Sequence, residues 1–68
     1  MGMISDEDKL SCATRELAMR RAIYPNRIRN GLMTEAMAQR EIALMAAIVM
    51  DYRAKVQPGF LDEETSKP

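Results

Sequence analysis

Few side chains in this 68-residue sequence could take part in catalysis. There is no histidine, so neither a Ser-His nor a Cys-His nucleophile can be assembled, and a Cys/His metal site is excluded as well. The one cysteine, Cys12, follows a run of acidic residues that disfavours a reactive thiolate. It has no second cysteine to pair with, which fits a reducing compartment. We expect Cys12 to pack as a small apolar side chain.

Paired carboxylates are the remaining route to acid–base catalysis. The candidates inside predicted helices are Glu16, Glu41 and Asp51. Two of them have a basic residue four positions further on, a spacing typical of an ion pair on a helix surface. Gly31 stands alone, so there is no glycine-rich loop to hold a phosphate. We therefore predict a protein that is not an enzyme and has no catalytic residues, no metal and no cofactor.

The arginines offer a binding site rather than a catalytic one. Residues 15–29 contain five arginines and one glutamate, a net charge of +4 in a chain whose formal charge is zero. This segment could be a solvated end of the molecule, a surface for an acidic protein, or a phosphate-binding patch. The candidate partner-binding residues are Arg20, Arg21, Tyr24, Arg27 and Arg29.

The elements that must position these residues are two helices, and the second is the better defined. Thr34 is a predicted N-cap, and a helix is expected over 35–56. Its apolar residues recur at alternating intervals of four and three, which is the seam of a packed helix. A second apolar row lies beside the first, so the helix must be covered from two directions. The central apolar run, 42–50, is nine residues long, and a membrane span needs about twenty, so we predict no membrane partner.

The first helix is expected over 6–24, with Ser5 as its N-cap. Pro25 is expected to break it and to start a short helix over 25–30, which Gly31 then ends. One face of the helix over 6–24 is formed by Leu10, Ala13, Leu17 and Tyr24, and a second face is formed by Cys12, Met19 and Ile23. Residues 1–5 are predicted to be a disordered or vector-derived N-terminus and 57–68 a flexible tail, in which Phe60 and Leu61 could fold back on the helices. The predicted fold is therefore all-α, an antiparallel two-helix hairpin with a short proline-started turn.

A chain of this size buries little apolar surface unless a disulfide, a metal or oligomerisation helps. Because the first two are missing, we predict that it pairs with itself into a homodimeric four-helix bundle. Ile42, Met45, Val49 and Tyr52 are expected to form the seam between copies, while Leu44 and Ile48 pack on Leu17 and Ile23; the spacing alone leaves the reverse assignment open. The candidate interface residues are Met37, Ile42, Leu44, Met45, Ile48, Val49 and Tyr52.

Residues 16–53 resemble a family of small helical proteins of phages and prophages. The shared pattern consists of Met19-Arg20-Arg21, Tyr24-Pro25, Gly31, Met33, Ala38, Glu41-Ile42, Met45 and Ile48. Most of these positions are helix, cap or turn positions, so the resemblance concerns the fold first. Asn26 and Leu32 stand where basic residues are expected, which disfavours binding to nucleic acid.

The resemblance implies a phage protein that works in the cytoplasm of a host cell. We expect a non-enzymatic protein that binds and modulates or inhibits a host protein, for example a quorum-sensing receptor, a pilus motor or a defence complex. One alternative is a small helical-hairpin dimer that binds RNA or DNA through its arginines. Another is a structural or assembly protein.

Overall fold

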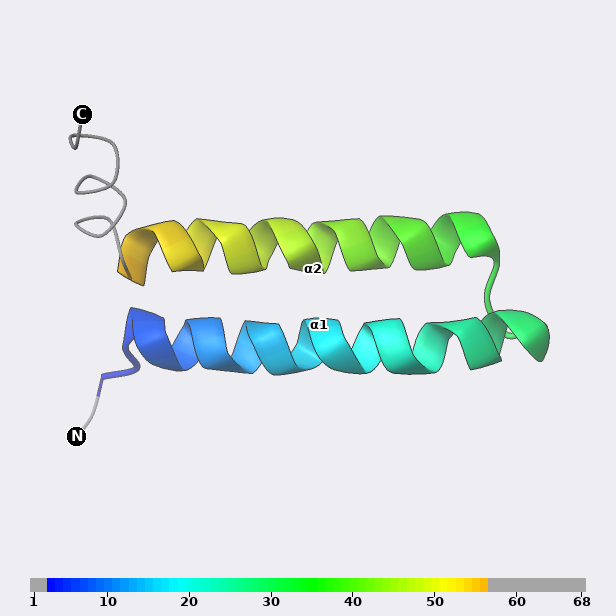
Figure 1. Cartoon of the computed structure of the whole chain (residues 1–68), viewed down its shortest axis with the longest axis horizontal. Helices are drawn as coiled ribbons and strands as arrows, with labels where there is room; N and C mark the ends of the chain where they lie inside the picture. Colours follow the sequence, from blue (N-terminus) through cyan, green and yellow to red (C-terminus); the bar gives the residue numbers. More distant parts are fainter. Residues whose placement is uncertain (1–2, 57–68) are drawn as a thin grey trace, which may run out of the picture.

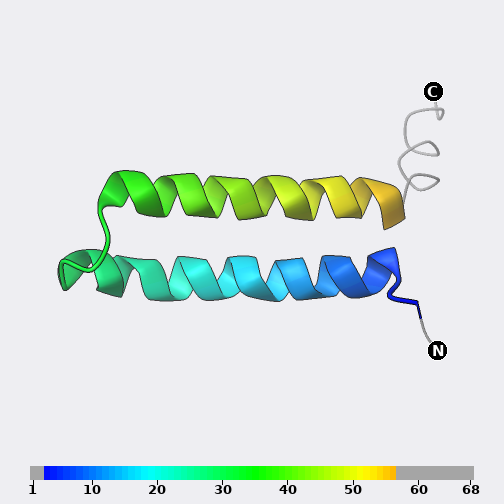
Figure 2. The same cartoon turned by 180° about the vertical axis from the view of Figure 1, so that it is seen from behind.

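Two α-helices lie side by side and antiparallel, joined by one short bend (Figures 1 and 2). The computed structural model describes residues 3–56; the predictions made for 1–2 and 57–68 lie outside the described residues. Helix α1 spans Asp6–Arg29 and helix α2 spans Glu35–Val56. The all-α hairpin predicted from the sequence is therefore confirmed. No helix in the described part of the chain has both the length and the apolar character needed to cross a lipid bilayer.

Both helices begin at the caps that the sequence predicts. The Ser5 hydroxyl accepts a hydrogen bond of 3.0 Å from the backbone N–H of Asp8. In the same way, the Thr34 hydroxyl accepts from the N–H of Met37 at 3.1 Å. Each cap satisfies an amide that has no partner inside the first turn. The acidic first turns of the two helices also suit the positive end of the helix dipole.

The predicted break at Pro25 is wrong, because α1 continues through it to Arg29. A proline removes the hydrogen bond that its own nitrogen would donate, here to the carbonyl of Arg21, and its ring crowds that carbonyl. Both residues are exposed, so water can reach that part of the backbone. The turn after Pro25 still closes, since the N–H of Asn30 donates to the carbonyl of Asn26 at 3.0 Å. The separate short helix over 25–30 is therefore the last turn of α1.

The bend that follows α1 has a defined geometry. The N–H of Gly31 donates to Ile28 at 3.1 Å, and the N–H of Leu32 donates to Arg27 at 2.9 Å. These two bonds make a Schellman motif, in which the residue after the cap takes left-handed backbone angles. Gly31 does so, with a φ of +74°, as expected of a glycine at this position. The bend therefore reverses the chain in a fixed way.

Replacing Gly31 with alanine is expected to lower the free energy of unfolding by about 1 kcal/mol, because a side chain at this φ is strained. An added Cβ would meet no atom within 4 Å, so the backbone angle is the whole cause. Urea unfolding followed by circular dichroism measures the effect. Gly31→Asn is the matched variant: it should lose less, since asparagine tolerates left-handed angles better than alanine. Equal losses would contradict this account.

The core between the helices is small. Its buried side chains are Ala13 and Leu17 from α1 and Val49 from α2, with Leu10, Ile42, Met45 and Ala46 packed around them. Ala38 is buried nearer the bend, at 3% exposure. The row with alternating four- and three-residue spacing in α2 therefore packs on α1 within the chain. The other row, which contains Leu44 and Ile48, is exposed.

Candidate functional site

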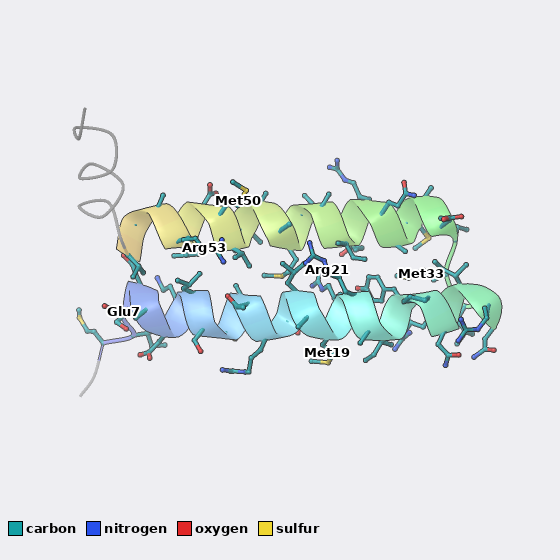
Figure 3. The ribbon with its side chains drawn as sticks, viewed as in Figure 1. Glu7, Met19, Arg21, Met33, Met50 and Arg53 are labelled. Atoms are coloured by element: carbon teal, nitrogen blue, oxygen red, sulfur yellow. The ribbon has the colours of Figure 1, made fainter. Side chains whose placement is uncertain are left out.

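The two broad faces of the hairpin carry different side chains. Arg21 from α1 and Arg53 from α2 lie on the face turned to the viewer in Figure 3, whereas Met19 and Met50 lie at the outer edges of the two helices. Cys12 lies nine residues before Arg21. Nine residues make two and a half turns of helix, so the Cys12 side chain points to the opposite side of α1 and belongs to the opposite face. That opposite face is the one turned to the viewer in Figure 2.

Large apolar side chains gather on that opposite face. Five of them are 39–54% exposed, and the cysteine is exposed as well. We call this surface the apolar face; it consists of Cys12 and Ile23 from α1 and Met37, Leu44 and Ile48 from α2, and it extends to Met19 at the outer edge of α1. The prediction that Cys12 is packed is wrong within one chain, because this flank of α1 does not turn toward α2. Nothing in the described chain covers these residues.

An open groove of about 590 Å³ runs along the apolar face near the chain termini. Cys12 and Glu16 line it from α1, and Met45, Ile48 and Tyr52 line it from α2. Two lysines stand over the Tyr52 ring, with the Lys9 Nζ 5.6 Å and the Lys55 Nζ 5.3 Å from its centroid. The groove has an apolar floor with charges at its rim.

One ionic network joins the two helices at the middle of this face. The Arg20 Nε donates to Glu16 Oε2 at 3.0 Å, which confirms the ion pair expected from their spacing. The Arg20 NH1 group donates to the backbone carbonyl of Glu41 at 2.9 Å and lies 3.5 Å from Glu41 Oε1. Arg20 is thus held by both helices. The group has two carboxylates for one guanidinium, a net charge of −1.

The surroundings of Arg20 favour its charged form. The hydrogen bond to Glu16 raises the pKa of Arg20 above its ordinary value, burial opposes this, and the nearby Tyr24, Glu16 and Glu41 add to the rise. A raised pKa means that the folded state holds the proton more tightly, so this contribution to stability is lost only as pH rises through that value. Arginine is already charged throughout the physiological range. The network therefore does not act as a pH switch under physiological conditions.

The structure does not bring the five predicted partner-binding residues together. Arg20 is engaged by Glu16 and Glu41, and the adjacent Arg21 lies on the opposite face of the hairpin. Arg29 donates to the side chain of Asn26 at 3.0 Å, and Tyr24 is half-buried. The arginines are spread over both faces and the last turn of α1 instead of forming one patch.

One exposed apolar residue at the bend is absent from the predicted site residues. Leu32 is 70% exposed, yet its backbone is fixed by the hydrogen bond to Arg27. It follows the Asn30-Gly31 turn, a position at which an apolar residue frequently packs back on its helix, so its exposure could not be predicted from the turn. Met33, beside it, is half-buried.

The seven predicted interface residues separate into two groups in the hairpin. Val49 is 4% exposed inside one chain, so its assignment to the seam between copies is wrong. Ile42, Met45 and Tyr52 are partly buried on the same side of α2, against α1. The predicted packing of Leu44 and Ile48 on Leu17 and Ile23 is wrong too, because both face outward; the structure has the reverse assignment, which the spacing left open. Met37, Leu44 and Ile48 remain available to a partner.

Nothing in the described residues assembles the groups of a metal site: no three cysteine, aspartate or glutamate side chains come close enough together to hold an ion. The most distinctive surface on residues 3–56 is the apolar face with its groove and central ionic network. Comparisons of the whole chain with protein-family models, with curated proteins and with solved structures find no match.

Proposed function

We propose that this chain is a non-enzymatic, phage-encoded protein that acts in the host cytoplasm by binding a host protein and modulating it. The apolar face carries this proposal. Monomeric soluble proteins expose few contiguous apolar patches of this kind, and those that do use them to bind. The six side chains occupy three turns of both helices, which suits contact with another helical surface.

The charges of the apolar face favour a protein partner over nucleic acid. Glu16 and Glu41 outnumber Arg20 at its centre, and Asp8 lies beside Lys9 at the rim of the groove. A phosphate backbone would be repelled by the unpaired carboxylate charge. Met19 and Met37, the two methionines of the apolar face, can adapt their shape to a partner, as in other protein-binding surfaces.

Retention of a host protein from lysate tests the proposal. We expect the tagged chain to retain one host protein in stoichiometric amount, with the same yield after nuclease treatment and at 0.5 M salt, because an apolar contact is weakly screened. Leu44→Asp should reduce the retained amount at least about tenfold, since it places a charge in the contact.

Met50→Asp is the matched control for that experiment. Met50 is 67% exposed on the same helix but points to its outer edge, away from the apolar face (Figure 3). The Met50→Asp variant should retain the host protein as the wild type does. Retention that disappears with nuclease, or falls steeply with salt, would replace the proposal with binding to RNA or DNA. Equal losses in both variants would remove the apolar face from the argument.

A further inference from the structure

The apolar face is one side of a molecule that has a single layer of helices (Figures 1 and 2). Folded domains are generally built from two packed layers, because a helix must bury its apolar side against something. Here only Ala13, Leu17, Ala38 and Val49 are buried among the described residues, at 9% exposure or less. The second layer must therefore come from outside the hairpin.

The apolar face has the same pattern on both helices. On α1, Cys12, Met19 and Ile23 are separated by seven and four residues. On α2, the intervals from Met37 to Leu44 and Ile48 are again seven and four. Each row is eleven residues long, about 16 Å along the helix. A surface whose two halves match in length and spacing can pair with an identical surface.

The register of the hairpin makes the two rows complementary. Ala13 packs with Val49, and Arg20 contacts Glu41, and these two contacts define the axial position of α1 relative to α2. In this register Cys12 is level with Ile48 within about one helical turn, and the same holds for Met19 with Leu44 and for Ile23 with Met37. A two-fold axis parallel to the helices would place each member of these pairs over the other member in a second copy.

We propose that a second copy of this chain covers the apolar face. The two hairpins form a four-helix bundle about a two-fold axis parallel to the helices, and α1 of each copy lies over α2 of the other. The inference rests on the proposed function in using the same surface: without the host protein a second copy covers the apolar face, and the host protein, when present, competes with that copy for it.

The ionic network has a role in this arrangement. Glu16, Arg20 and Glu41 sit at the middle of the contact, where the two-fold brings the networks of both copies close together. Each network has a net charge of −1, so the two networks repel each other at the centre, and the apolar rows on both sides must outweigh this repulsion.

Sedimentation equilibrium on the full chain between 1 and 100 µM tests the pairing. The wild type should show twice the 7.7 kDa chain mass, and Leu44→Asp should raise the dissociation constant at least about 100-fold, because the two-fold places the charge in the contact twice. Met50→Asp should pair like the wild type. A wild-type monomer at 100 µM, a trimer or tetramer, or equal dissociation of both variants would overturn the proposal.

If Leu44→Asp does not fold, thermal unfolding of the wild type still tests the pairing. The wild-type midpoint should rise with protein concentration, since only the folded state pairs. A midpoint that is constant over a hundredfold range would show that the hairpin folds alone. These measurements involve no host protein, so a failed pairing and a failed host interaction are separate results.

Cysteine cross-linking tests which helices meet. In a Cys12→Ala background, Ile23→Cys with Met37→Cys should give a covalent dimer on oxidation, because the two positions face each other only across the two-fold. Met19→Cys with Met50→Cys is the control and should stay uncross-linked, since Met19 and Met50 lie at opposite outer edges. A monomeric product from the first pair would overturn this arrangement of helices.

Discussion

Val49→Asp is expected to leave the chain unfolded at 25 °C. Val49 is 4% exposed at the centre of the core, in contact with the side chains of Ala13 and Leu17. An ionised carboxylate has no cationic partner there, and burying it unpaired costs at least about 4 kcal/mol. A hairpin of this size has only about 3–5 kcal/mol of stability to lose. Far-ultraviolet circular dichroism should show the loss of most helical signal.

The adjacent residue supplies the control for this result. Met50→Asp introduces the same side chain one position along, at a site that is 67% exposed. It should change the free energy of unfolding by no more than about 0.5 kcal/mol. If both variants keep their helices, the assignment of Val49 to the core is wrong, and the row that contains Leu44 and Ile48 would have to face α1 instead.

Pro25→Ala is expected to stabilise the protein by about 1–3 kcal/mol. The nitrogen of Pro25 cannot donate inside α1, and alanine would restore a bond to the Arg21 carbonyl. Part of the gain is lost because alanine leaves the unfolded chain freer than proline does. Denaturant unfolding at fixed protein concentration measures the difference.

Ala22→Pro is the complementary variant of that experiment. Ala22 is exposed and lies one turn earlier in α1, so a proline there removes a bond deeper in the helix. It should destabilise by about 3 kcal/mol. If Pro25→Ala instead lowers stability, the restriction that Pro25 imposes on the unfolded chain outweighs the missing hydrogen bond.

Local chemistry in the sequence was sufficient to predict most of the fold. Ser5, Thr34 and Gly31 define the helix ends through their own hydrogen bonds and backbone angles, so short segments contain the necessary information. Pro25 could not be judged in this way, because whether a helix ends at a proline depends on the residues that continue it. The hydrogen bonds from Asn30 and Leu32 hold the final turn together.

The candidate site was harder to predict, because it depends on the rotation of one helix against the other. Two rows of α2 have helical spacing, and the sequence leaves open which of them faces α1. The small Ala13 and Ala38 allow close approach on one side only, so Val49 packs inward and Ile48 outward. The prediction that the arginines form one binding site failed for a related reason: Arg20 and Arg21 are adjacent in sequence but about 100° apart around the helix.

The short, hydrogen-bonded bend has a kinetic consequence. Only five residues separate α1 from α2, so the contacts between the helices form across a small loop near the bend and then extend toward the termini. Low contact order of this kind is typical of helical proteins that fold in microseconds to milliseconds. Diffusional encounter of two copies at micromolar concentration is slower than that. Each chain should therefore form its hairpin first, and the rate of assembly should depend on protein concentration rather than on folding.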